Sequence, residues 1–559
     1  MGRLIEDFPR RERVLLDGVW GFVAADRASE RVPPRAAFRE RLAVPGVWEM
    51  SLAHFRHRGL GWFQRDFETP WRSAAGMRLV FEAVSHTAEV WLDGQRLGGH
   101  YGAHTPFELV APAKPGARRL VVRADNRFGP DNPLTTSGQD IYTYGGIPRG
   151  VYVERLPDVH IRRIAARPVF DGRRWWIEVE ALVAASGGAA LPREGRVALD
   201  GRQLGSLKVN ARGQAKGRLA AGGVAWWSPD MPSLHMLTVE AGEDLWQDRV
   251  GFRTIEAKGR RLLLNGKPLI LQGVNRHEFH PHFGPAVPPA VHLRDIEILK
   301  QLGANFVRGS HYPNDPLFLD LCDENGILFW EELSHWQATP EQMTGALFRQ
   351  RSLEQAQEMI RRDERHPCVI LWGALNEART DTPEGRETAR MILKRFRQLD
   401  PTRLVTLATS RPEGDLCFDL VDVASANIYP GWYVGSLEDL DKQAGRYLDI
   451  IKRRSRGKPV ILSEFGAAGV AGARSFELRK WTEDYQAELL RRMIGMARSS
   501  GFISGVALWQ YCDVRTSADL WSNRAREYNN KGIVTEHREP KAAFAAVAAE
   551  FAKPWKPPR

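Results

Sequence analysis

Two apolar runs in the second half of this chain each contain a glutamate at or near the end, and together they restrict the folds open to it. The runs are 371–377 (LWGALNE) and 461–466 (ILSEFG). Continuous apolar runs of this length are typical of strands buried on both faces of a parallel sheet. In a parallel α/β barrel the C-terminal ends of the strands form the active face, so Glu377 and Glu464 would project into one pocket.

Two opposed carboxylates are what a retaining glycosidase needs, one as proton donor and one as nucleophile. The alternative is that each glutamate caps the helix that follows it or pairs with a surface arginine. Asn376 precedes the first glutamate, and aromatic residues occur around both, which helix capping does not require. The two runs therefore favour a glycoside hydrolase with Glu377 and Glu464 as its catalytic residues.

The surrounding sequence alternates strand-like and helical segments, as such a barrel requires. Amphipathic helical stretches, for example 293–302 and 476–497, lie between most of the apolar runs. Eight strands in about 300 residues is the (β/α)8 TIM barrel, which we predict over residues 256–559. The predicted strands are 269–273, 305–308, 327–330, 368–372, 404–407, 423–426, 459–462 and 506–509.

The chain before residue 256 has only short, alternating strand-like runs separated by turn residues. Within 1–157, Asp93-Gly94 is predicted to join 90–92 and 95–97 in a tight hairpin, and the strand spacing predicts a jelly-roll β-sandwich. Residues 158–255 are predicted to form an immunoglobulin-like β-sandwich. Its predicted strands are 161–169, 175–182, 196–199 and 235–240.

Length and composition fit a protein of several domains. At 559 residues the chain is too long for one core. No apolar stretch of 18 residues occurs, so we expect no membrane span, and the first residues contain no apolar signal core. Isolated cysteines without metal-ligand spacing lead us to expect buried, reduced thiols in a cytoplasmic protein. They are Cys322, Cys368, Cys417 and Cys512.

The net charge of +11 raises the question of an anionic partner. The basic residues are scattered in short groups, such as 452–454 and 491–492, mostly on the polar faces of helical patterns. We therefore expect solvated arginines and no nucleic-acid partner, since no nucleic-acid-binding motif accompanies the charge. No cluster of metal-ligating residues occurs either, so we expect neither a metal nor an organic cofactor.

The domain order, with Glu377 after the fourth barrel strand and Glu464 at the seventh, resembles glycoside hydrolase family 2 over essentially the whole chain. Three local runs support the resemblance: 84–94 followed by 105–107, 264–278, and 308–313. It implies a retaining exo-β-glycosidase that forms a glycosyl-enzyme on Glu464, with Glu377 as acid/base. It also implies a homo-oligomer, dimer or tetramer, that acts on a small glycoside or oligosaccharide.

The resemblance also implies roles for residues around the two glutamates. Asn376 would bond the sugar 2-hydroxyl, and Tyr429 would hold the nucleophile oriented and ionised. Trp509 would form a platform under the sugar ring. His311 and His277 are further candidates to line the pocket. The alternative for each is an ordinary buried polar group or, for Trp509, packing at the barrel mouth.

Within the family, two segments resemble the β-glucuronidases. Segment 427–433 (NIYPGWY), which includes Tyr433, resembles their sixth-strand run. Asn529 and Lys531 resemble the Asn-x-Lys pair that grips the glucuronate carboxylate. Asp140 resembles a jelly-roll carboxylate that accepts hydrogen bonds from distal sugar hydroxyls; its alternative is a turn cap.

The sequence also departs from that subgroup. Ala525 stands where β-glucuronidases usually carry an arginine, with Arg524 and Arg526 on either side, and Pro430 stands where many relatives have tyrosine. Arg526 is predicted to help bind the substrate. The sequence thus predicts a β-glucuronidase, with β-galacturonidase or β-galactosidase as alternatives that use the same machinery.

One further alternative belongs to another class, a non-catalytic carbohydrate-binding protein. The presence of both Glu377 and Glu464 argues against it, because binding alone does not need two opposed carboxylates. Residues 332–343, after the third predicted barrel strand, contain no long insertion. We therefore expect the leaving-group side of the pocket to be open.

Overall fold

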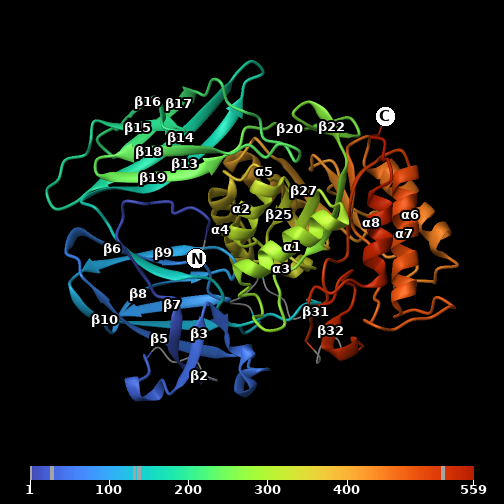
Figure 1. Ribbon diagram of the computed structural model, residues 1–559, viewed down its shortest axis with the longest axis horizontal. Helices are drawn as coiled ribbons and strands as arrows, with labels where there is room; N and C mark the ends of the chain where they lie inside the picture. The colour runs from blue at the N-terminus through green and yellow to red at the C-terminus, as the bar shows by residue number, and fades with distance from the viewer. Residues whose placement is uncertain (1–2, 26–30, 130–133, 135–139, 518–522, 559) are drawn as a thin grey trace.

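The protein combines two β-sandwiches with a closed parallel barrel, which confirms the predicted fold class. The computed structural model describes residues 3–25, 31–129, 134, 140–517 and 523–558. In Figure 1 the first sandwich (blue) and the second (green) lie on one side of the barrel, whose helices run from yellow-green to red.

The first sandwich packs a six-stranded sheet, in the order β3-β2-β5-β10-β7-β8, against a four-stranded sheet, β1-β12-β6-β9. Trp20 on β2 and Leu79 on β6 are fully buried in the core between them. The strands are β1 Arg13–Leu15, β2 Gly18–Ala25, β3 Glu40–Val44, β5 Leu60–Thr69, β6 Ser73–Phe81, β7 Thr87–Leu92, β8 Gln95–Tyr101, β9 Phe107–Ala113, β10 Gly116–Asp125 and β12 Val151–Arg155. Two short strands, β4 Gly46–Val47 and β11 Gly146–Ile147, pair separately.

The predicted hairpin joins β7 to β8. Asp93 and Gly94 both have positive φ, 52° and 83°. A two-residue primed turn needs this backbone at both central positions, and Asp-Gly is among the pairs that adopt it most readily. The hairpin prediction is therefore confirmed.

The second sandwich contains the four predicted strands and three others. Its sheets have the orders β13-β14-β17 and β16-β15-β18-β19. Two of the unpredicted strands, β16 and β17, carry few large apolar residues, which weakens their alternation. The strands are β13 Val159–Phe170, β14 Trp175–Ala185, β15 Glu194–Leu199, β16 Arg202–Lys208, β17 Gln214–Ala220, β18 His235–Ala241 and β19 Asp244–Val250.

A small sheet leads from this sandwich into the barrel, which closes through eight parallel strands. The small sheet consists of β20 Ile255–Lys258, β21 Arg261–Leu264 and β22 Lys267–Leu269. The barrel strands are β23 Leu271–Arg276, β24 Phe306–Gly309, β25 Leu328–Glu332, β26 Val369–Asn376, β27 Leu404–Thr409, β28 Ala424–Asn427, β29 Val460–Glu464 and β30 Ile503–Leu508. All eight predicted strands overlap these.

Helices cover the outside of the barrel. They are α1 Pro289–Leu302, α2 Pro316–Asn325, α3 Pro340–Thr344, α4 Ala346–Asp363, α5 Pro383–Leu399, α6 Leu440–Arg454, α7 Glu483–Ser499 and α8 Ala542–Phe551. The predicted helix 476–497 begins later, at Glu483, because the Thr482 side chain accepts a hydrogen bond from the Tyr485 N–H and caps the helix there. None of the described helices is both long and apolar enough to cross a membrane.

Residues 140–150 of the first sandwich reach the mouth of the barrel. The Tyr142 N–H donates to the carbonyl of Arg515 (2.7 Å), at the end of the short strand β31 Val514–Arg515. Arg149 donates to the buried carboxylate of Glu278 (2.9 Å). These two attachments hold the segment that carries Asp140 beside the C-terminal ends of the barrel strands.

Candidate active site

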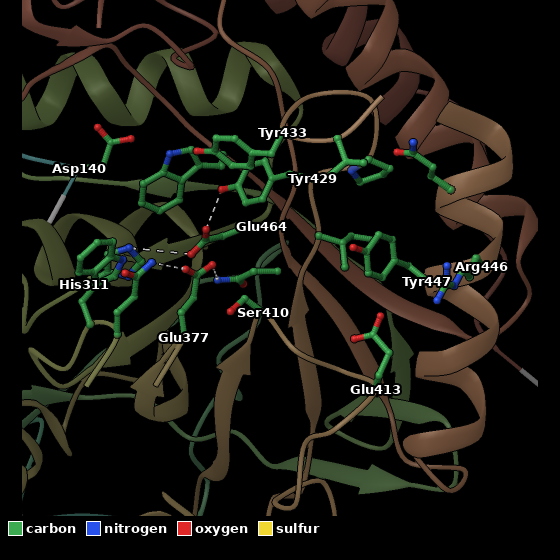
Figure 2. A pocket seen from close by; sticks show the side chains of 18 residues that line it. Asp140, His311, Glu377, Ser410, Glu413, Tyr429, Tyr433, Arg446, Tyr447 and Glu464 are labelled. Atoms are coloured by element: carbon green, nitrogen blue, oxygen red, sulfur yellow. Dashed lines mark hydrogen bonds and ion pairs between the residues drawn. The ribbon is translucent and has the colours of Figure 1, made fainter. Parts of the chain in front are cut away.

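The C-terminal ends of the barrel strands surround a cavity of about 540 Å³. Glu377, directly after β26, and Glu464, the last residue of β29, both line it (Figure 2). The structure thus brings together the two glutamates that the sequence predicted to share a pocket. Other predicted residues that line the cavity are Asp140, His311, Tyr429, Tyr433 and Trp509.

Glu464 is buried and held at both carboxylate oxygens. Its Oε1 accepts from Arg308 Nη1 (2.8 Å) and its Oε2 accepts from the Tyr429 hydroxyl (2.7 Å). Burial raises the pKa of Glu464 above its ordinary value, and the charge of Glu377 adds to the rise. Arg308, His311 and the Tyr429 hydrogen bond act in the opposite direction, by favouring the carboxylate.

Tyr429 is a hydrogen-bond donor to Glu464, the position predicted for it. Burial raises the pKa of the Tyr429 phenol well above its ordinary value, and the charge of Glu464 raises it further. The phenol therefore keeps its proton at physiological pH. It can donate to the carboxylate, and it cannot add a competing negative charge beside it.

Glu377 has a different environment. Its Oε1 accepts from Asn427 Nδ2 and its Oε2 from Gln337 Nε2, both at 3.0 Å. Among the described residues, no cationic side chain forms an ion pair with this carboxylate. Neutral amides stabilise a carboxylate less than an arginine does, and that suits a group that must carry a proton. The geometry thus favours Glu377 as the acid and Glu464 as the nucleophile.

Asn376, the last residue of β26, is buried beside the cavity and is not itself a lining residue. Its Oδ1 accepts from Arg308 Nη2 (2.8 Å) and Asn427 Nδ2 (3.0 Å). Its buried Nδ2 has no hydrogen-bond partner among the described residues. Buried amides are nearly always satisfied, so this Nδ2 is the atom that the predicted contact to a sugar hydroxyl would use.

Arg308 is the most connected group in the site, and the sequence analysis gave it no role. Its fully buried guanidinium donates to Glu332 (3.0 and 3.1 Å), Asn376 and Glu464. Arg308 lies on β24 and Asn427 ends β28. A polar residue at the C-terminal end of an apolar barrel strand was the available signal for both.

His311 and Trp509 form one side of the cavity. Their rings stack with a centroid separation of 5.0 Å and an interplanar angle of 13°. His311 Nδ1 lies 2.8 Å from the Glu332 carboxylate. His277 packs edge-on against Trp509, with its Nδ1 3.3 Å from the Tyr312 hydroxyl. His311 and Trp509 therefore line the cavity, whereas His277 contacts Trp509 and is not a lining residue, contrary to the prediction for it.

Two cations converge on Asp140, which lines one end of the cavity, and neither cation is itself a lining residue. Lys531 Nζ, which is buried, lies 3.7 Å from Asp140 Oδ2 and 3.3 Å from Asn529 Oδ1. Arg524 Nε donates to Asp140 Oδ1 (3.1 Å). The Tyr433 ring lies 5.4 Å from the Lys531 ammonium. Asn529 and Lys531, predicted to bind a sugar carboxylate, therefore lie beside Asp140, predicted to bind the distal sugar hydroxyls.

Arg526 does not join this group. Its guanidinium donates to Glu536 (2.8 Å) and Asn530 (3.3 Å). Arg526 and Glu527 both have positive φ, 61° and 60°, which turns the chain here. The structure thus places Arg524, and not Arg526, next to Lys531 and Asp140.

The described residues contain one buried group with metal-ligand atoms, Asp323, His366 and Cys368. Asp323 already accepts from His366 Nδ1 (2.6 Å) and from the Cys368 N–H (2.9 Å). The Cys368 thiol lies 3.6 Å from the Leu319 carbonyl, to which it donates. None of the three lines the cavity, so this group is best explained as a structural hydrogen-bonded cluster.

Comparisons with known proteins agree with this geometry. Residues 255–553 match the family model described as glycosyl hydrolases family 2, TIM barrel domain, and residues 14–157 match the sugar binding domain of that family. The structure of a β-galacturonidase from Eisenbergiella tayi bound to galacturonate is 35% identical, covers 100% of both chains and has a TM-score of 0.91.

Two β-glucuronidases are also similar. The Rattus norvegicus enzyme is 28% identical over 96% of this chain and 90% of its own. The Bifidobacterium dentium enzyme, solved with coumarin-3-O-glucuronide, is 26% identical, covers 98% of each chain and has a TM-score of 0.88. These relatives span nearly the whole chain, so the match includes all three parts of the fold.

Proposed function

The chain belongs to glycosyl hydrolases family 2, and on that premise we propose that it is a retaining exo-β-hexuronidase. Such an enzyme releases a terminal β-linked uronic acid from a glycoside. The observation that carries the proposal is the convergence of Lys531 and Arg524 on Asp140. Two positive charges face one negative charge there, and a sugar carboxylate would balance the remaining charge.

The two catalytic carboxylates have environments suited to double displacement. Glu464 would attack the anomeric carbon while the carboxylic acid of Glu377 donates its proton to the leaving oxygen. Glu377, now ionised, would take a proton from water, which attacks the anomeric carbon and releases Glu464. Retention predicts that the β-anomer is released first, which proton NMR detects. It also predicts carboxyl groups about 5–5.5 Å apart in a crystal structure, against roughly 6.5–9.5 Å for inversion.

Two sugars are candidates, and each has its own support. Glucuronide is favoured by the Asn-x-Lys pair and by the β-glucuronidase relatives. Galacturonide is favoured by the 35% identity to the β-galacturonidase, and by Ala525 in the position where β-glucuronidases carry arginine.

The test is a side-by-side measurement of kcat/KM on 4-nitrophenyl β-D-glucuronide, β-D-galacturonide and β-D-galactoside. We expect one of the two acidic sugars to be hydrolysed fastest. A galactoside that outperforms both would contradict the carboxylate-binding role of Lys531. The cytoplasmic location and the homo-oligomeric state stay predictions, which cell fractionation and light scattering can check.

A further inference from the structure

The cavity continues past the catalytic pair, on the side away from Asp140. Figure 2 shows the two glutamates between Asp140 at one end and Glu413, Arg446 and Tyr447 at the other. We call the part of the cavity lining on that side of the glutamates the outer lobe. It consists of Ser410, Glu413, Gln443, Arg446 and Tyr447.

Two separate elements build the outer lobe. Gln443, Arg446 and Tyr447 lie on α6 at spacings of three and four residues, which places them on one face of the helix. Ser410 and Glu413 lie in the loop that follows β27. A helix face and a strand-end loop of the barrel therefore enclose this part of the cavity.

The charged groups of the outer lobe are free to bind a ligand. Within the described part of the chain, the side chains of Glu413 and Arg446 form neither a hydrogen bond nor an ion pair with another residue. Arg453, also exposed on α6, is equally unpaired but does not line the cavity. Position, and not exposure alone, therefore distinguishes Arg446.

The direction of the reaction assigns this lobe to the leaving group. Glu377 must reach the oxygen between the uronic acid and the leaving group. Gln337, which donates to Glu377, lines the cavity next to it. Because the carboxylate of the uronic acid would lie at the Lys531 end, the leaving group extends the other way, toward the outer lobe.

The chemistry of the lobe matches a sugar. Arg446 and the Gln443 amide are donors, Glu413 is an acceptor and the Ser410 hydroxyl is both, while the Tyr447 ring offers a flat apolar face. A sugar presents hydroxyls around its edge and C–H groups on its face, so it uses all of these. An aryl or alkyl leaving group would use the Tyr447 ring but few of the polar groups, and the exposed Glu413 and Arg446 would stay hydrated.

We propose that the outer lobe is a binding subsite for a sugar as leaving group, so that the substrate is an oligosaccharide with a terminal β-linked uronic acid. The proposal rests on the proposed hexuronidase function and names its substrate class. The residues of the outer lobe would then determine which glycoside is cleaved, while Glu377 and Glu464 perform the cleavage.

The test compares two substrates that share the uronic acid preferred by the wild type. One is the 4-nitrophenyl glycoside, and the other is a disaccharide with the uronic acid β-linked to a hexose. We expect Arg446→Ala to lower the ratio of kcat/KM on the disaccharide to kcat/KM on the nitrophenyl glycoside about tenfold. Glu413→Gln keeps the shape but removes the charge, and we expect a smaller fall in the same ratio.

Arg453→Ala is the matched control on the same helix, and it should leave the ratio within about twofold of the wild type. An unchanged ratio in Arg446→Ala, or an equal fall in Arg453→Ala, would overturn the subsite. A wild-type enzyme that hydrolyses neither acidic substrate would instead overturn the hexuronidase function. The two failures are therefore distinguishable.

Discussion

The two halves of the cavity are built in opposite ways. In the inner half, each carboxylate oxygen of Glu377 and Glu464 accepts a hydrogen bond from a described side chain. In the outer lobe, Glu413 and Arg446 have no such partner among the described residues. Groups held in place need no reorganisation as charge develops in the transition state, whereas side chains without a protein partner can reorient to bind the leaving group. The contrast indicates that catalysis and leaving-group choice are separable.

The largest expected effect comes from breaking the inner half. Glu464→Ala should lower kcat by about 10⁴-fold or more, because no glycosyl-enzyme can form. Added azide should restore turnover and yield an α-glycosyl azide, identified by NMR, since the small anion can occupy the space of the missing carboxylate.

Glu377→Ala is the matched partner of that experiment. It should cost about 10²–10⁴-fold on substrates with poor leaving groups, yet keep the glycosylation step on 4-nitrophenyl glycosides, which need little proton donation. An azide product of β geometry from Glu464→Ala would exchange the roles of the two glutamates.

The next effect separates the charged end of the inner half from the rest. Lys531→Ala should cost roughly 2–4 kcal/mol of transition-state binding on the acidic sugar, or about 30- to 1,000-fold in kcat/KM. A neutral galactoside, with no carboxylate to lose, should be affected far less.

Arg524 and Arg526, on either side of Ala525, should differ in their effect on acidic sugars. The structure places Arg524 beside Asp140 and turns Arg526 toward Glu536. Arg524→Ala should therefore lose more activity on the acidic sugar than Arg526→Ala does. If Lys531→Ala harms acidic and neutral sugars equally, Lys531 is a structural residue and the β-galactosidase alternative takes the lead.

The smallest expected effect is a shift in pH dependence. Glu464 must be ionised to attack, so kcat/KM falls as the pH drops through its raised pKa. The Tyr429 hydrogen bond lowers that pKa, and Tyr429→Phe removes it. The pKa should therefore rise further, and the acid limb of the pH profile of kcat/KM should move to higher pH. A limb that stays in place or moves to lower pH would show that Tyr429 only fills space.

Part of the site was predictable because of where strands end. The apolar runs before Glu377 and Glu464 identify barrel strands, and all parallel strands of a barrel end on one face. The same reasoning, with the family resemblance, placed Tyr429 and Trp509 at the cavity. The helix predicted from residue 476 was too long for a different reason. The helical pattern of apolar residues was read through a segment that lies before the Thr482 cap, outside the helix.

The tertiary structure alone decided which side chains meet. Arg308 bonds residues that are 24, 68 and 156 positions away along the chain, and Arg524 bonds Asp140 of another domain. Arg526 and Glu527 both have positive φ, and Arg526 bonds Glu536 instead of the Asp140 that Arg524 contacts.

By itself, the sequence predicted the fold class and the two strand-end glutamates that line one cavity, because hydrophobic period and strand order are local signals. The hydrogen bonds that separate acid from nucleophile, the cations at Asp140 and the lobe on α6 depend on distances between segments remote in sequence. Such distances are set only when the chain packs, because a loop's direction follows from its backbone angles and from the partners that packing brings to it.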